Sequence, residues 1–425
     1  MKRLITFLMS MLFCFSCGCS EKHAERVSWE DRNFETVELD NGERYLNETR
    51  IDKALLEESM QRACDRLKGN IDKFKNGFPE TCSKDGVYGV SERFNWERGM
   101  LVGCYWLAYQ YTGDEVFKNA AEDMIEIFAE HAKTGEWLND HDTGFIYSPS
   151  CVAGYKITGD EKMKETALKA ADILYSHYDT ENKFIIRSGK REDVSYDMYR
   201  ALVDSMMNIP LFFFAYEETG DEKYLNAAVD HYHTTMAYLI RDDGSSYHHY
   251  QFDPKSGNPV KGVTWQGYSD DSCWTRGHSW LLYGFPIAYS YTNNDEILPL
   301  YKNISNYYLN RLPSDNIPYW DLVFTEGSDE PRDSSAAAIS TCGFLEMYNH
   351  VEDEEQKMIL KNAADAQMLS LIENCENRGD DDGMVLHVTH ALPQGQGIDE
   401  SAVYADYFYM EALMRYLETD FIRYW

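Results

Sequence analysis

The sequence predicts an all-α protein whose helical hairpins close into an (α/α)6 barrel, a toroid of six hairpins. One phrase, Tyr-x-x-Thr-Gly-Asp-Glu followed by an amphipathic helix, recurs along the chain. Its copies begin at Tyr109, Tyr155 and Tyr216, with weaker copies at Tyr289 and near Asn349, and residues 51–74 imply a sixth hairpin. No Pro-, Ser- or Gly-rich linker divides the chain beyond about the first forty residues. The alternative, an open solenoid, would need a cap at each end.

Each copy of the repeat carries the signals of a helical hairpin. One helix ends in aromatic residues, and the glycine supplies the tight reversal. The aspartate after it caps the next helix, whose Ala-rich face packs back against the first. Four of the connections are long and hold aromatic residues: 137–147, 242–280, 319–338 and 394–410. We expect these connections to line one mouth of the barrel.

The first twenty residues predict an export signal. They have a basic start, a short apolar run and small residues before Cys19, and the run is too short for a permanent membrane span. Residues 17–20 resemble a bacterial lipoprotein cleavage box, with Cys19 as the acylated residue and Cys17 as the alternative. We expect a lipoprotein-type signal peptide over 1–19, a tether over 20–47 and one (α/α)6 domain over 48–425. The protein would lie in the periplasm or on the outer membrane of a bacterial cell, or be released into the periplasm by an ordinary signal peptidase.

The formal charge of −32 narrows the choice of partners. It opposes binding of nucleic acid and of anionic membrane surfaces, so we expect membrane contact only through a lipid anchor. An anionic ligand would need a local cation. Seven cysteines follow the signal segment, an odd number with no C-x-x-C pair, so neither a zinc site nor a disulfide scaffold is predicted.

Asp204 is the first candidate catalytic group. Three apolar residues recur every four positions around it: Met198, Leu202 and Met206. This spacing predicts a helix that carries Asp204 and Asn208 on a neighbouring face and is broken or kinked at Pro210. Apolar surroundings raise the pKa of a carboxyl group, which suits a general acid. The alternative is an exposed aspartate that caps a helix starting at Ser205.

Asp142 is the second candidate. It lies in the run His141-Asp142-Thr143-Gly144-Phe145, which places a carboxylate in a turn beside an imidazole and a flexible glycine. If Asp142 and Asp204 meet in the fold, the charge of one raises the pKa of the other. The alternative is an aspartate that only caps a helix.

A third cluster has the composition of a site for acidic sugars. Residues 265–280 hold Trp265, Trp274 and Trp280, whose flat rings can stack on sugars, together with Gln266 and Arg276. The alternative is a core cluster in which Asp270 or Asp271 neutralises Arg276. The adjacent His248 and His249 lack further ligands at a suitable spacing, so we expect hydrogen bonding there and no metal.

Several stretches together resemble one known family over roughly Tyr45 to Tyr416. They are Asn95-Trp96, HDTGF from His141, Asp204 to Asn208, Asp243 to His248, WQGYSDDSCWTRGHSW from Trp265, RDSSAAA from Arg332, and Asp406-Tyr407-Phe408 leading to Glu411. The chain is similar in these stretches to the unsaturated glucuronyl hydrolases, glycoside hydrolase family 88. The unsaturated rhamnogalacturonyl hydrolases of family 105 are more distant relatives.

The resemblance implies an (α/α)6 barrel without metal or cofactor. It implies Asp204 as the general acid and base, Asp142 as its essential partner, and substrate contacts from Trp96, His248, Gln266, Arg276, Trp280 and Tyr407. We add His141 and Trp274 as substrate-binding candidates from their places beside Asp142 and in the aromatic loop. No tryptophan stands near Ser188-Gly189, where the family has one, and no Ser-x-x-Ser-x-Lys sulfate-binding pattern is present.

The implied substrate is an oligosaccharide left by a polysaccharide lyase, with a C4=C5 double bond in its terminal uronic acid. Hydration of that bond, with Asp142 keeping Asp204 protonated, would release the sugar. Two other classes remain open. A sugar epimerase would need two facing histidines, for which His248 and His278 are the candidates. A surface lipoprotein that only captures glycans would explain the tryptophans but not the two aspartates.

Overall fold

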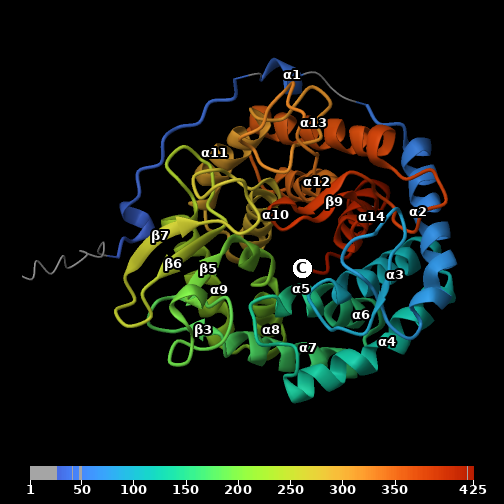
Figure 1. Cartoon of the computed structure of the whole chain (residues 1–425), viewed down its shortest axis with the longest axis horizontal. Coiled ribbons are helices and arrows are strands. Elements are labelled where there is room, and N and C mark those ends of the chain that lie inside the picture. The colour runs from blue at the N-terminus through green and yellow to red at the C-terminus, as the bar shows by residue number, and fades with distance from the viewer. Residues whose placement is uncertain (1–25, 41, 47–49, 419) are drawn as a thin grey trace, which may run out of the picture.

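The computed structural model describes residues 26–40, 42–46, 50–418 and 420–425. The predicted signal peptide, including Cys17 and Cys19, lies outside these residues. In the described part of the chain, two concentric rings of helices form the barrel, which confirms the predicted fold (Figure 1). The outer ring consists of α2 (Lys53–Phe74), α4 (Glu115–Thr134), α7 (Glu161–Tyr175), α9 (Glu222–Thr234), α11 (Ile297–Leu309) and α13 (Glu354–Ser370). The inner ring consists of α3 (Arg98–Thr112), α5 (Thr143–Tyr147) with α6 (Ala153–Thr158), α8 (Pro210–Thr219), α10 (Thr275–Thr292), α12 (Ser334–Tyr348) and α14 (Val403–Leu417).

The two rings differ in burial. Helices of the inner ring are buried on nearly every side, as α12 is from Ser334 to Met347, whereas those of the outer ring bury one stripe. This is the expected pattern for helices inside a protein and for helices on its surface. The sixth hairpin pairs helices from opposite ends of the chain, α2 and α14. Helix α14 packs against both α2 and α3 and so closes the ring.

The repeated phrase forms the turns predicted for it. Gly113, Gly159 and Gly220 end the first helix of three hairpins with φ of 67°, 73° and 68°. The following Asp114, Asp160 and Asp221 each accept a hydrogen bond from the backbone N–H two residues on. In the fourth hairpin Asn293 takes the left-handed position with φ 49°. The structure also explains the threonine of the phrase, since Thr112 Oγ1 donates to Ala108 O and accepts from Asp114 N.

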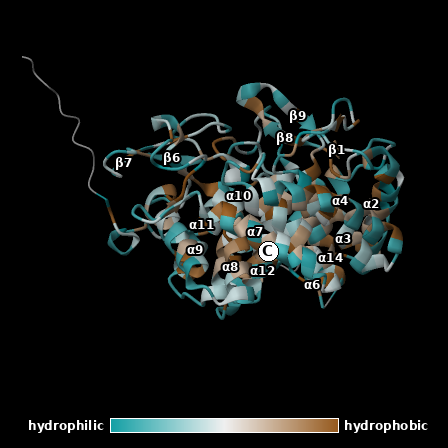
Figure 2. Cartoon of the chain, turned by 90° about the horizontal axis from the view of Figure 1, so that it is seen from below, coloured by the Kyte–Doolittle hydropathy of each residue, from teal (hydrophilic) through white to brown (hydrophobic). Residues whose placement is uncertain are grey.

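Short strands and turns lie at one end of the barrel. The strands are β1 (Phe78–Pro79), β2 (Val90–Ser91), β3 (Tyr178–Asp179), β4 (Phe184–Ile185), β5 (Arg200–Leu202), β6 (His249–Phe252), β7 (Pro259–Val263), β8 (Val388–Ala391) and β9 (Gln396–Glu400). All pairings are antiparallel, and β5, β6 and β7 form one sheet in that order. Figure 2 shows β6 to β9 on the same side of the helical body. Short helical turns complete the described chain: η1 (Trp29–Asp31), α1 (Glu43–Leu46), η2 (Ser148–Val152), η3 (Tyr196–Met198), η4 (Val203–Met207), η5 (Thr235–Leu239), η6 (Leu371–Cys375) and η7 (Leu392–Gln394).

The predicted helix around Asp204 is wrong. The segment from Arg200 to Leu202 is strand β5, in which Leu202 pairs with His249, and Asp204 lies in the 3-10 turn η4. The helix begins only at Pro210, its first residue, and so Pro210 starts a helix where the sequence analysis expected it to break or kink one. Pairing with β6 outweighs the four-residue spacing of apolar residues, which is a local signal.

Residues 26–40 and 42–46, which belong to the predicted tether over 20–47, lie along the outside of the barrel. Val27 N donates to Tyr238 Oη, and Trp29 stacks on His233 with ring centroids 5.1 Å apart. Further on, Asn303 and Asn310 pair with the backbone of this segment, and Tyr45 is 1% exposed. No helix in the described part of the chain combines the length and apolar character needed to cross a bilayer.

Candidate active site

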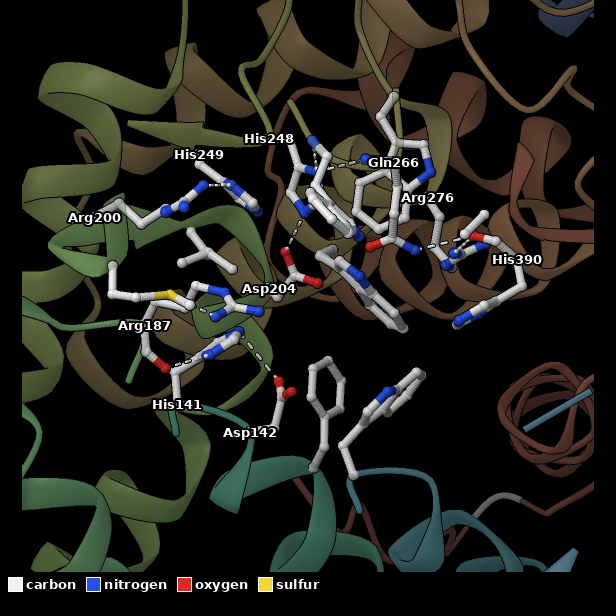
Figure 3. Close-up of a pocket in the computed structure, with 18 of the residues that line it drawn as sticks. His141, Asp142, Arg187, Arg200, Asp204, His248, His249, Gln266, Arg276 and His390 are labelled. Atoms are coloured by element: carbon white, nitrogen blue, oxygen red, sulfur yellow. Dashed lines mark hydrogen bonds and ion pairs between the residues drawn. The ribbon is translucent and has the colours of Figure 1, made fainter. Parts of the chain in front are cut away.

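A pocket of about 290 Å³ opens at the end of the barrel that carries the strands. Nine of the ten candidate catalytic and substrate-binding residues line it: Trp96, His141, Asp142, Asp204, His248, Gln266, Trp274, Arg276 and Trp280. Figure 3 shows Asp142 and Asp204 pointing into this space from different segments. Three of the four long connections supply lining residues, and the fourth, 319–338, supports them through Asp321 and Asp333.

Asn208 holds the two aspartate-bearing segments together. Its Oδ1 accepts from Phe145 N at 2.8 Å, and its Nδ2 donates to Asp204 O at 3.1 Å. The segments approach so closely that a Cβ on Gly144 would lie 2.4 Å from the Asn208 backbone. The glycine of the HDTGF run is therefore needed for close approach of the two backbones.

Asp142 is paired with His141, and backbone contacts assign the proton between them. His141 Nδ1 lies 3.1 Å from Arg187 O, so Nδ1 carries the hydrogen and donates it to this carbonyl. In the neutral ring, Nε2 is then an acceptor, and it lies 3.2 Å from Asp142 Oδ1. Burial and the nearby Asp140 and Asp204 raise the pKa of Asp142 well above its usual range, while burial lowers the pKa of His141. Asp142 therefore holds the proton.

Asp204 has the opposite arrangement. His248 Nδ1 accepts from the backbone N–H groups of Trp265 (3.2 Å) and Gln266 (3.3 Å), which leaves the hydrogen on Nε2. That Nε2 lies 3.5 Å from Asp204 Oδ2. Burial works to raise the pKa of Asp204, but His248, His141 and the backbone N–H of Asp204 together outweigh it, so the pKa lies below its usual value. Asp204 is ionised in the ligand-free protein, and the expectation that apolar surroundings and Asp142 keep it protonated is wrong for this state.

Arg276 lies at the pocket wall but is 1% exposed and ion-paired. Its Nη1 contacts Asp333 Oδ2 at 2.7 Å and Thr389 O at 2.9 Å, and its Nη2 donates to His390 O. The partner is thus Asp333, and neither Asp270 nor Asp271 neutralises Arg276 as the alternative supposed. Much of the guanidinium that we expected to be free for a carboxylate is already engaged.

Aromatic rings form one wall of the pocket. Phe145 lies between Trp96 and Trp280, with ring centroids 5.1 and 5.0 Å away, and Trp274 backs the His248 ring at 4.3 Å. Trp265 is 62% exposed at the rim. These rings offer flat apolar faces to a sugar at the bottom and at the mouth of the pocket.

Two predicted residues lie elsewhere. Tyr407 is fully buried outside the pocket, where its ring contacts Phe408 and Trp425, so its position does not fit the predicted sugar contact. Its neighbour one turn earlier, Tyr404, faces Trp96 and Arg276. His278 is also buried, between Ile304 O and Ser246 Oγ. It lies outside the pocket and does not face His248, so the pair of histidines expected for an epimerase is not formed.

Several residues that line the pocket are not among the predicted site residues, among them Arg187, Met198, Arg200 and His249. Met198, Arg200, Leu202 and Asp204 all line the pocket. Every second residue from 198 to 204 thus lines the pocket, although only Arg200–Leu202 is strand β5, while Met198 ends η3 and Asp204 lies in η4. No residue type in the sequence marks this alternation, because the extended backbone of Arg200–Leu202 depends on pairing with β6.

Among the described residues, one group has ligand atoms close enough to hold a metal ion, within 4.8 Å of one another: Asp140, His141 and Asp142. Asp140 Oδ1 accepts from Asp142 N at 3.0 Å, and Asp142 shares its proton with His141. Metal binding would have to displace that proton. The absence of a metal remains a prediction.

An (α/α)6 barrel with two carboxyl groups facing one pocket, one with a raised pKa and one with a lowered pKa, set among indole rings, is an arrangement suited to a glycan-cleaving enzyme. Residues 70–417 match the sequence profile of Glycosyl Hydrolase Family 88. The chain belongs to this family and is a glycoside hydrolase.

Individual relatives agree with this assignment. The chain is 42% identical over 397 residues, 92% of its length and 99% of the relative, to the unsaturated chondroitin disaccharide hydrolase of Streptococcus pneumoniae. A crystal structure of unsaturated glucuronyl hydrolase from Streptococcus agalactiae superposes with a TM-score of 0.89 at 39% identity, covering 93% of this chain and 99% of that one. A variant of the same enzyme, complexed with dGlcA-GalNAc6S, gives a TM-score of 0.83 at 38% identity with the same coverage.

Proposed function

We propose that this enzyme removes the terminal 4,5-unsaturated uronic acid from oligosaccharides left by polysaccharide lyases, with glycosaminoglycan fragments as the substrate class. The observation that carries the proposal is a pair of half-buried carboxyl groups in one small aromatic pocket, Asp142 with a raised pKa and Asp204 with a lowered one. The names of the relatives, which refer to unsaturated glucuronyl and chondroitin substrates, support it.

The proposed reaction is hydration of a vinyl ether. A proton added to C4 leaves positive charge at C5, shared with the ring oxygen, and a water then adds at C5 and loses its proton. The hemiketal opens, and the hemiacetal left at the anomeric carbon expels the rest of the glycan. One water is consumed, and no group attacks the anomeric carbon, so the carboxylate spacing rules for retaining and inverting enzymes do not apply.

Asp204 is the proposed acid and base of these steps. A uronate carboxylate bound near Arg276 brings a second negative charge beside Asp204, which raises the proton affinity of Asp204. The proton held by Asp142 in the free protein then moves to Asp204. Asp204 gives this proton to C4 and afterwards takes one from the attacking water. The ionised Asp142 accepts a hydrogen bond from a sugar hydroxyl during the reaction.

The test uses unsaturated disaccharides prepared from chondroitin, hyaluronan, heparin and ulvan, with one from rhamnogalacturonan as the family 105 alternative. Hydration removes the conjugated double bond, so the ultraviolet absorbance falls. We expect loss on at least one glycosaminoglycan fragment and no loss with Asp204→Asn. Unchanged absorbance on every fragment, with binding retained, would favour the glycan-capturing alternative.

We also propose that the protein is exported and lipidated at Cys19. The basic start, the short apolar run and the Gly-Cys-Ser junction support this. Mass spectrometry of the mature N-terminus tests it, and a free terminus at a residue other than Cys17 or Cys19 would rule it out.

A further inference from the structure

Two arginines line the pocket without a carboxylate partner. Arg187 and Arg200 come from neighbouring extended segments joined by a hydrogen bond from Arg187 N to Arg200 O (3.1 Å). Within the described chain neither side chain makes an ion pair. Arg187 Nη1 donates to the thioether of Met198 at 2.9 Å, and sulfur is a weak acceptor. These guanidinium groups therefore keep most of their hydrogen-bonding capacity.

The arrangement is unfavourable in the ligand-free protein. Arg200 Nε is buried without a hydrogen-bond partner. Burial, together with the charge of Arg187, lowers the pKa of Arg200. Two like charges and an unpaired buried donor destabilise the fold. Such features are typical of sites that become satisfied when a ligand binds.

His249 adds a third donor. Arg200 Nη1 lies 3.0 Å from His249 Nδ1, and because a guanidinium can only donate, Nδ1 is the acceptor. The hydrogen of the neutral ring is then on Nε2. Burial and the charges of His248, Arg200 and Arg187 lower the pKa of His249 well below its usual value, which keeps the ring neutral.

These donors lie opposite the other polar end of the pocket. Figure 3 shows Arg187, Arg200 and His249 on one side of Asp204, and Gln266, Arg276 and His390 on the other. A substrate that spans the pocket past Asp204 can place one anionic group at each end. The total charge of the protein is strongly negative, so two unpaired cations in one place are unexpected unless they meet an anion.

We propose that Arg187, Arg200 and His249 form a second anion subsite, which binds a sulfate ester on the substrate while the uronate carboxylate lies on the Arg276 side. A sulfate ester stays ionised and offers three acceptor oxygens, which match donors from two guanidinium groups and one imidazole. A single carboxylate would be satisfied by one arginine fork. The inference rests on the proposed function for the rest of the substrate.

The test compares three unsaturated disaccharides: one without sulfate, one with sulfate on O2 of the uronate, and one with sulfate on O6 of the hexosamine. We expect the wild-type protein to favour one sulfated compound in kcat/KM, and the favoured compound identifies the position of the ester. Arg200→Met should lower the ratio of sulfated to unsulfated kcat/KM roughly 10- to 100-fold, the size of one lost charge-assisted hydrogen bond. Arg200→Lys keeps the charge and should lose less.

Arg191→Met is the matched control. It removes the same charge from the same region, but Arg191 donates to Glu181 and to Pro254 O outside the pocket, so the ratio should not change. Arg200→Met removes a like charge beside Arg187 but also the donor to His249 Nδ1, so the melting temperature of each variant is measured together with the ratio. A lower melting temperature with an unchanged ratio of sulfated to unsulfated kcat/KM would mean that Arg200 has a structural role, and it would overturn the proposal.

Two other outcomes would also overturn it. Equal losses on sulfated and unsulfated compounds would mean that the pair binds the uronate carboxylate, and a wild-type protein indifferent to sulfate has no such subsite. If no compound is hydrolysed, the proposed function fails separately. Calorimetry with the same three disaccharides then decides the subsite alone, since tighter binding of a sulfated compound that Arg200→Met weakens would support it and equal binding would refute it.

Discussion

Asn208 gives the most direct test of how the fold positions the two aspartates. The change is Asn208→Ala, which removes a fully buried amide that accepts from Phe145 N and donates to Asp204 O. The Phe145 N–H and the Asp204 carbonyl are then left without these partners. Each unpaired buried group costs about 1 to 3 kcal/mol, so we expect the free energy of unfolding to fall by roughly 2 to 5 kcal/mol.

The same change should lower activity by more than the loss of folded protein explains. Asn208 is a positioning residue that links the segment after Asp142 to the segment of Asp204, and a shift of about 1 Å between reacting groups costs roughly 10²-fold in rate. We expect kcat to carry most of the loss, with KM changing less. Denaturant unfolding gives the stability, and steady-state kinetics on a hydrolysed disaccharide gives the split.

Asn362→Ala is the control for this experiment. Asn362 is also a buried asparagine, on the outer helix α13, and donates to Tyr45 O at 2.7 Å far from the pocket. Its loss should cost stability of the same order and leave kcat/KM of the folded protein unchanged. If the two variants show the same activity when both are folded, Asn208 does not set the geometry of the site, and the reasoning is refuted.

Three further predictions follow from the site and the core. Asp204→Asn should lower kcat by ~10³ or more and leave the melting temperature nearly unchanged, because it removes proton transfer and not packing; normal turnover in the folded variant would remove the assignment. Arg276→Ala should destabilise the protein by about 3 to 5 kcal/mol, because it leaves the fully buried Asp333 uncompensated, and an unchanged denaturation midpoint would contradict this. Asp406 is buried and accepts hydrogen bonds from the backbone N–H groups of Met384 and Val385, and burial raises its pKa to about 7. The folded protein therefore binds the Asp406 proton more tightly than the unfolded chain does. As a result, the protein loses stability as the pH rises from about 4 to about 7. Asp406→Asn should therefore become more stable relative to wild type by roughly 3 to 4 kcal/mol between pH 4 and pH 7, and a difference that does not change with pH would refute the assignment.

The barrel was predictable because its signals are local and repeated. Gly113 and Asp114 determine a turn and a cap within a few residues, and the same phrase recurs around the ring. Strand β5 was not predictable in this way, because Arg200 to Leu202 become extended by pairing with β6, about fifty residues later. Reading this strand as a helix hid the place of Arg200, which strand β5 directs into the pocket together with Leu202.

The sequence predicted which residues form the site better than it predicted their protonation states and ion-pair partners. Both aspartates line the pocket as expected, but in the ligand-free protein the pKa shifts place the proton on Asp142 and not on Asp204. The protonation of Asp204 depends on His248, whose tautomer is set by the backbone N–H groups of Trp265 and Gln266. Likewise the partner of Arg276 is Asp333, from a connection nearly sixty residues away, and not the neighbouring Asp270 or Asp271. Such contacts depend on the tertiary structure, and no spacing in the sequence encodes them.

The closure of the ring by α2 and α14 has a consequence for how the protein folds. The inner helix of the last hairpin begins at Val403, whereas its outer partner ends at Phe74, so this contact joins segments separated by almost the whole chain. The other hairpins join neighbouring helices and can form as the chain grows. The loss of chain entropy on joining such distant segments slows a folding step that depends on it. The pocket takes lining residues from both sides of the contact that closes the ring, from Trp96 near α3 to Gln396 before α14. We therefore expect catalytic activity to appear only after this contact has formed, later than most of the helical circular-dichroism signal.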